Sequence, residues 1–107
     1  MADLDFDLTV TRDPQGGSQL TLRGELDLAT AGRLEQALAS ASAPVVLDLR
    51  GLTFMDSTGV RVLLEAAEDA DGRLSIIPPA AGDARLTIDE TGIGAVLPLA
   101  ADPEGPR

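Results

Sequence analysis

The 107-residue sequence predicts a single α/β domain with a mostly parallel sheet, one antiparallel strand at the sheet edge, and helices packed against it. Two alternating apolar runs near the N-terminus, joined by turn residues, predict a hairpin. A segment with helical apolar spacing then leads to the β-branched run VVLDL, and this order of strand, helix and strand predicts a parallel crossover. Residues 1–107 are expected to form one domain, with 1–3 and 101–107 frayed.

The first two predicted strands come from alternation of apolar and polar residues over 4–10 and again over 20–28. DPQGG at 13–17 supplies the residues for a chain reversal between them. In this interpretation, Asp5 and Asp7 lie on the solvent face of the first strand.

The crossover follows from the next two segments. Residues 31–41 carry apolar side chains three and four positions apart, which predicts a helix with Thr30 available as its N-cap. Pro44 then introduces VVLDL at 45–49, a short apolar run typical of a strand that is covered on both faces.

The second half of the chain repeats this alternation of helix and strand. A second amphipathic pattern over 57–72 predicts a longer helix, and RLSII at 73–77 predicts a strand that ends at two prolines. Residues 82–91 predict a short helix, which the glycines of TGIG end, and a weak strand is expected near Val96.

Composition excludes several classes of function. The net charge is -10 and the chain contains no Lys, His, Cys, Trp or Tyr, so nucleic acids and anionic membranes are not expected as partners. Only carboxylates remain as metal ligands, without calcium-loop spacing, so no metal site is expected. The absence of Cys, of a long apolar run and of a basic N-terminus together predict a soluble cytoplasmic protein.

The same absences weigh against catalysis. Ser57 stands at a predicted strand-to-helix turn with Gly59 after it, as in a nucleophile elbow, but Met55 replaces the elbow's first glycine. No His or Lys is present to take the serine proton. The missing lysine also excludes a phosphate-binding loop and the phosphoaspartate receiver that Asp48 suggests, so Asp48 is interpreted as a polar strand residue. The chain is therefore expected to be no enzyme and to need no cofactor.

One stretch remains to be explained, TFMDSTGVRVLLEA at 53–66. The simplest interpretation is that Asp56 or Ser57 is the N-cap of the helix. Together, however, GELDLATAGRLEQAL, VVLDLRGLTFMDSTGVRVLLEA and ETGIGAVLP occur in the order and at the intervals typical of the STAS domain family. The chain resembles in particular the bacterial anti-sigma factor antagonists of that family, over nearly its whole length.

The resemblance implies a switch. In such antagonists the serine of Asp-Ser-Thr-Gly is phosphorylated by a serine kinase that is also the anti-sigma factor, and a serine phosphatase reverses the modification. The unmodified antagonist binds the kinase and releases the sigma factor. Carried over to this chain, the phosphorylated residue is Ser57, and Asp56 and Gly59 shape its turn. The resemblance implies a partner-binding surface of Asp27, Asp56, Ser57, Thr58 and Gly59. Asp27 of GELD is then a neighbouring polar contact on the partner-binding surface.

Two alternatives stay open. The chain is also similar to STAS subunits of membrane transporters, including lipid-transport complexes, which need no phosphorylation. The complete Asp-Ser-Thr-Gly and the lack of a membrane segment favour the antagonist. A nucleotide-binding role is disfavoured because no lysine or glycine-rich loop is available for phosphates. The segment after Gly82 departs from the family pattern, since ARLTIDETG is more acidic and less apolar than the usual third helix.

Overall fold

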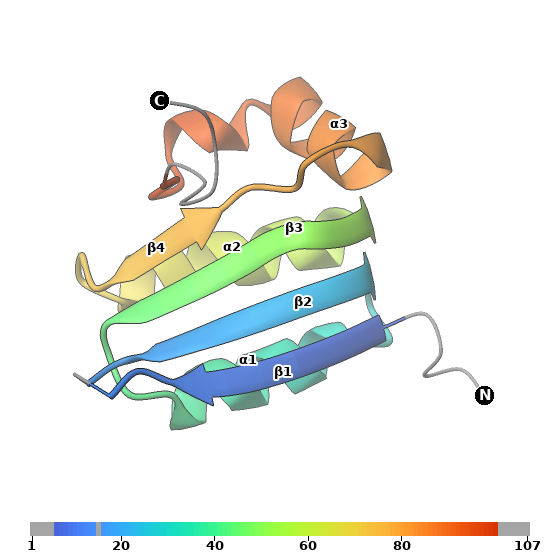
Figure 1. The fold of residues 1–107 in the computed structure, drawn as a ribbon. Helices are drawn as coiled ribbons and strands as arrows, with labels where there is room; N and C mark the ends of the chain where they lie inside the picture. Colours follow the sequence, from blue (N-terminus) through green and yellow to red (C-terminus); the bar gives the residue numbers. More distant parts are fainter. Residues whose placement is uncertain (1–5, 15, 101–107) are drawn as a thin grey trace.

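The computed structural model describes residues 6–14 and 16–100. They contain a four-stranded sheet with the strand order β1-β2-β3-β4 (Figure 1). The strands are β1 (Phe6–Arg12), β2 (Ser18–Leu26), β3 (Val45–Met55) and β4 (Leu74–Ile77). β1 pairs antiparallel with β2, while β2 with β3 and β3 with β4 pair in parallel. The predicted fold class, hairpin and crossover are therefore confirmed.

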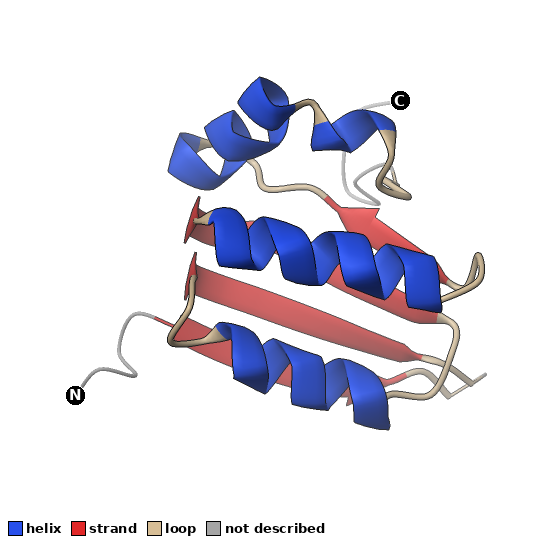
Figure 2. Ribbon diagram, turned by 180° about the vertical axis from the view of Figure 1, so that it is seen from behind, coloured by secondary structure: helices blue, strands red, loops and turns tan. Residues whose placement is uncertain are grey.

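The two long helices, α1 (Ala31–Ser40) and α2 (Ser57–Asp69), lie on the same face of the sheet (Figure 2). α3 (Gly82–Thr91) and the short 3₁₀ helix η2 (Ile93–Ala95) lie beyond β4 (Figure 1). Because β4 ends at Ile77, the second half of β3 has no partner strand on that side in the described chain. α3 packs there instead, and the Thr87 hydroxyl donates to the Met55 carbonyl at 3.3 Å.

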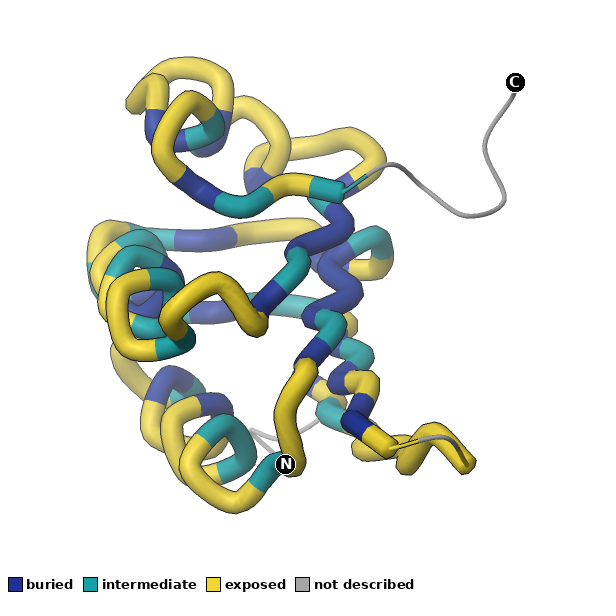
Figure 3. Tube along the Cα trace, turned by 90° about the vertical axis from the view of Figure 1, so that its left-hand side faces the viewer, coloured by how far each residue is buried: buried dark blue, intermediate teal, exposed yellow. Residues whose placement is uncertain are grey.

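The core fills the space between the sheet and the two helices, where buried segments of both face each other (Figure 3). Aliphatic side chains make up nearly all of it, as the aromatic content of 2% requires. Its fully buried members are chiefly leucines: Leu20, Leu22, Leu26, Leu34, Leu47, Leu49, Leu52 and Leu63. Burial of such side chains contributes about 1.5 to 3 kcal/mol each and holds α1 and α2 against the sheet.

The prediction that VVLDL is covered on both faces is wrong. Its side chains alternate, with Leu47 and Leu49 under the helices and Asp48 on the opposite face. Neighbouring strands present polar residues on that opposite face, among them the exposed Thr9 and Gln19. Asp48 is buried there because the Arg50 guanidinium covers it and donates to it at 2.8 Å.

Several boundaries also differ from the predictions: β1 continues past Val10 to Arg12, β3 continues past 49 to Met55, and α2 ends at Asp69 and not at 72. β2 ends at Leu26, so Leu28 belongs to a loop and not to the strand. Val10, within the edge strand β1, is half exposed. No strand forms at Val96, which follows η2, although a single parallel bridge joins Leu99 to Ile76.

The last helix agrees closely with its prediction. α3 covers the predicted 82–91, and Gly92 ends it with a left-handed φ of 73°. The predicted frayed ends, 1–3 and 101–107, lie outside the described residues, as does Asp5. Within the described ranges, no helix is long and apolar enough to cross a membrane.

Candidate functional site

The candidate site begins where β3 passes directly into α2. Asp56 has an extended conformation and its Oδ1 accepts a hydrogen bond from the Gly59 N–H at 3.1 Å. Asp56 is therefore the N-cap, one of the two residues proposed for that position, and Ser57 is the first residue of the helix. The cap satisfies one of the free N–H groups at the helix start and fixes the orientation of the turn that carries Ser57.

Residue 59 must be glycine because the turn leaves no space for a side chain. A Cβ at this position would lie 2.6 Å from Met55 Cγ, 2.9 Å from the Leu26 carbonyl oxygen and 3.1 Å from Leu26 Cγ. The first turn of α2 thus touches the end of β2, and only a residue without a side chain allows this approach. The glycine of Asp-Ser-Thr-Gly has a structural role that needs no partner.

The second part of the site is the loop between β2 and α1, which Asp27 organises. Its Oδ1 accepts hydrogen bonds from the backbone N–H groups of Ala29 at 3.0 Å and Thr30 at 3.2 Å. Thr30 occupies the N-cap position of α1, as predicted, but its side chain makes no cap hydrogen bond to the helix. The Thr30 hydroxyl instead donates to the Glu25 carbonyl at 2.9 Å, and the carboxylate of Asp27 holds the turn.

Two hydrogen bonds join the loops. The Leu28 N–H donates to Asp56 Oδ2 at 3.3 Å, and the Asp56 N–H donates to the Leu26 carbonyl at 3.2 Å. Both loops follow the carboxyl ends of neighbouring parallel strands, which lie at the same edge of the sheet (Figure 1). The structure therefore brings Asp27 beside the turn of Asp56 to Gly59, although 29 positions separate Asp27 from Asp56 in the sequence.

Exposure distinguishes the residues of this surface. Ser57 is exposed, Thr58 is half-buried and Gly59 is buried. Within the described ranges, the Ser57 hydroxyl makes no side-chain hydrogen bond, so the oxygen is accessible to a reagent or a partner. The sequence interpretation missed Leu28, whose side chain is 77% exposed beside Asp56. The turn-forming Asp27 immediately before it was the available signal that the strand ends early.

Asp48 has no part in this surface, since it lies in the middle of β3 on the open face of the sheet. Hydrogen bonds from the Arg50 side chain lower the pKa of the Asp48 carboxyl below its usual value, against the opposing effect of burial. The pair is a structural ion pair within the sheet. No group of three or more His, Cys, Asp or Glu residues suited to a metal ion occurs in the described part of the chain.

Comparison with known proteins identifies the family. The family model described as "Mlab, STAS domain" matches residues 9–97, a range that includes both loops of the site. The chain belongs to the STAS domain family. The resemblance inferred from the sequence motifs is confirmed.

Named relatives of this STAS domain are antagonists. The anti-sigma-F factor antagonist RsfB of Mycobacterium tuberculosis is 36% identical over 66 residues, which are 57% of this chain and 54% of the relative. The same protein from a second strain matches equally. The chain spans about half the length of the curated relatives it matches.

Solved structures show the same architecture. The crystal structure of an anti-sigma factor antagonist from Mycobacterium paratuberculosis superposes with a TM-score of 0.76 at 27% identity, covering 92% of this chain and 88% of the other. The unphosphorylated anti-sigma factor antagonist SpoIIAA superposes with a TM-score of 0.67 at 19% identity, covering 92% and 90%. At 19% identity, the similarity to SpoIIAA shows a shared fold alone.

Proposed function

We propose that this STAS domain is an anti-sigma factor antagonist. In its unphosphorylated form it binds an anti-sigma factor with serine kinase activity and so releases the sigma factor; phosphorylation of Ser57 abolishes that binding. The names of its relatives support the assignment to the anti-sigma factor antagonists. The observation that carries the proposal is the exposed Ser57 hydroxyl on a turn that Asp56 and Gly59 hold in place.

The position of Ser57 suits a modification that spares the fold. A phosphoryl group adds about -1.5 to -2 charges at neutral pH, and the N-terminus of a helix stabilises negative charge by about 0.3 to 1 kcal/mol. The side chain points to solvent and has no intramolecular partner to lose among the described residues. The domain therefore stays folded when Ser57 is modified.

The effect of the phosphate falls on the partner. A surface that packs against a small hydroxyl must then accept a bulky dianion, beside the carboxylates of Asp27 and Asp56 and on a chain of net charge -10. A loss of about 3 to 4 kcal/mol lowers affinity more than a hundredfold. Asp27, Asp56, Ser57 and Thr58 form the partner-binding surface in this proposal, and Gly59, which the sequence resemblance also assigned to it, is buried and shapes the turn from beneath. The domain is a substrate of the kinase in the cytoplasm, has no catalytic role, and is reset by a serine phosphatase.

The test is phosphoryl transfer followed by binding. The domain is incubated with ATP and each anti-sigma factor kinase encoded in the same genome, and the phosphate is located by mass spectrometry. We expect modification at Ser57, and Ser57→Ala abolishes it while retaining partner binding. Ser57→Asp weakens binding at least tenfold, and Thr9→Ala, an exposed position of β1 on the face of the sheet away from α2, is the control that keeps Ser57 modifiable.

A different pair of results would support the alternative function. If no kinase modifies Ser57 and the domain binds a transporter ATPase with equal affinity whether residue 57 is Ser or Asp, it is an unphosphorylated STAS subunit of a membrane transporter. Phosphate found reproducibly at another residue, with partner binding lost, would also overturn the assignment of Ser57.

A further inference from the structure

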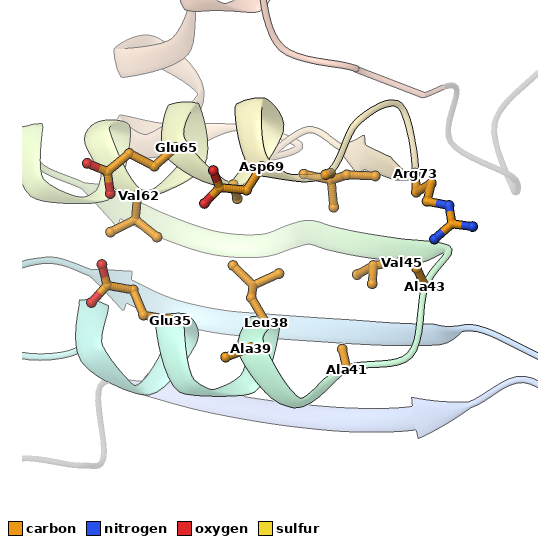
Figure 4. A pocket seen from close by; sticks show the side chains of 13 residues that line it. Glu35, Leu38, Ala39, Ala41, Ala43, Val45, Val62, Glu65, Asp69 and Arg73 are labelled. Atoms are coloured by element: carbon orange, nitrogen blue, oxygen red, sulfur yellow. The ribbon is translucent and has the colours of Figure 1, made fainter.

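A second surface lies between α1 and α2, away from Ser57. The two helices leave a half-open groove of about 450 Å³ between their C-terminal halves (Figure 4). Its walls include Leu38 from α1 and Val62 from α2, and Val45 and Leu74 of the sheet lie at its base. The volume falls within the range of about 300 to 1,000 Å³ typical of ligand-sized sites.

Small side chains and unequal helix lengths create this groove. Ala39 and Ala41 on one side and Ala66 and Ala70 on the other cannot fill the space between the helices. α1 has 10 residues and α2 has 13. The chain turns to an extended conformation at Ala41, so the last turn of α2 has no helical neighbour on this side. The accessible apolar surface of the groove thus comes from Leu38 and these alanines, since Val45, Val62 and Leu74 are buried.

The rim of the groove is acidic at one end. Glu35 of α1 and Glu65 of α2 stand on opposite sides, and Asp69 follows one turn later on α2 (Figure 4). Glu65 forms a salt bridge with Arg61, with 3.1 Å between Glu65 Oε1 and the Arg61 guanidinium. Glu35 and Asp69 form no ion pair with the residues that the structure describes. Arg73 lies at the opposite end of the groove.

We propose that this groove docks a basic amphipathic helix of another protein. Such a helix places aliphatic side chains against Leu38 and the alanines of the walls and Lys or Arg beside Glu35 and Asp69, so that both the apolar walls and the acidic rim are complemented. The head group of a fatty acid or an anionic phospholipid would meet three carboxylates, those of Glu35, Glu65 and Asp69, against the single guanidinium of Arg73. The charge of the rim therefore selects the helix.

The groove is separate from the phosphorylation surface. Ala66 lies nine residues after Ser57 on α2, which is about 13 Å along the helix axis. The lining residue of α2 nearest to Ser57 is Val62, five residues or about 7.5 Å along the axis, so Ser57 itself lies outside the groove. We expect affinity at the groove to be unchanged by the state of that serine. The domain then holds one partner through the turn at Ser57 and a second through the groove.

A designed peptide tests the proposal. The probe is a fluorescein-labelled 14-residue helix of Leu and Lys with leucines on one face, and its counterpart has Glu in place of Lys. By fluorescence anisotropy we expect the Lys peptide to bind the whole domain and the Glu peptide to bind at least tenfold more weakly. Glu35→Lys lowers affinity for the Lys peptide about tenfold at low salt. Ala39→Phe, which fills the groove from an exposed position, lowers it at least as much.

Matched controls separate the groove from general charge attraction. Glu68→Lys changes the net charge by the same amount as Glu35→Lys, but Glu68 is an exposed residue of α2 that does not line the groove. Ala95→Phe adds the same side chain to η2, and Ser57→Asp tests independence from the first surface. We expect all three to bind like the wild type. Equal weakening by Glu35→Lys and Glu68→Lys, unchanged binding by Ala39→Phe, or no binding of the Lys peptide overturns the proposal.

Discussion

Replacing Gly59 by alanine tests the steric account of the Asp-Ser-Thr-Gly turn. The new methyl group would lie 2.6 Å from Met55 Cγ and 2.9 Å from the Leu26 carbonyl oxygen. Met55 can shift its flexible side chain, but the Leu26 carbonyl belongs to the backbone and accepts the Asp56 N–H, so its displacement weakens a hydrogen bond of the same turn.

The expected magnitude follows from two opposing effects. Alanine is about 1 kcal/mol better than glycine within a helix. Forcing a methyl group into a packed site costs about 1 to 3 kcal/mol, and the upper part of that range applies because a backbone atom blocks the site. The net expectation for Gly59→Ala is a loss of about 1 to 2 kcal/mol in the free energy of unfolding, which lowers Tm by about 4 to 10 °C.

Gly32→Ala is the matched control, because Gly32 lies in the first turn of α1 and a Cβ there meets nothing within 4 Å. We expect it to stabilise the domain by about 0.5 kcal/mol. The chain has no Trp or Tyr, so unfolding in urea is followed by far-ultraviolet circular dichroism. If Gly59→Ala is as stable as Gly32→Ala, the contact between α2 and the end of β2 does not restrict residue 59 and the steric account is wrong.

Three further predictions concern Asp56, Ser57 and Asp48. Asp56→Ala removes the cap of α2 and lowers the free energy of unfolding in urea by about 0.5 to 2 kcal/mol, whereas Asp56→Asn keeps an acceptor and costs less; equal losses would contradict the cap. Ser57→Asp leaves the free energy of unfolding unchanged or raises it by up to about 1 kcal/mol, and a clear loss of Tm would show that negative charge at residue 57 disturbs the fold. Arg50 lowers the pKa of the Asp48 carboxyl in the folded state. The ionised Asp48 therefore contributes to stability above its unfolded pKa of about 3.9, and this contribution disappears as the pH falls through the pKa that Asp48 has in the folded state. The difference in stability between wild type and Asp48→Asn should therefore narrow in urea titrations from about pH 4 downward, and a gap that widens in acid would contradict the sign of the shift.

Local patterns in the sequence predicted most elements because each is set by neighbours close in the chain. The helix at Ala31–Ser40 follows from apolar side chains three and four positions apart in its own segment, and the end of the helix at 82–91 follows from the glycine after it. The residue types next to the start of α2 limited its cap to Asp56 or Ser57, and the structure selects Asp56. The hairpin formed at DPQGG because the turn and the alternation agree.

The predictions were wrong where a segment distant in the sequence determines burial or the end of a strand. The run at 45–49 predicted cover on both faces, but α1 and α2 both lie on one face, and the Asp48 carboxylate on the other is buried by Arg50. The predicted strand at 20–28 continued too far because the alternation at Leu28 outweighed the turn-forming Asp27 before it, and because the sequence does not show that the distant Asp56 holds the loop.

The amino-acid sequence by itself determined the order of strands and helices, the parallel crossover and the presence of a hydroxyl at the start of α2, since periodicity, caps and turns act over a few residues. Tertiary structure alone decided that Asp27 and Leu28 lie beside the turn of Ser57, that Gly59 must lack a side chain, and that α1 and α2 leave a groove between them. These features depend on the parallel pairing of β2 with β3 and on the lengths of the two helices that follow those strands, which bring together residues far apart in the chain.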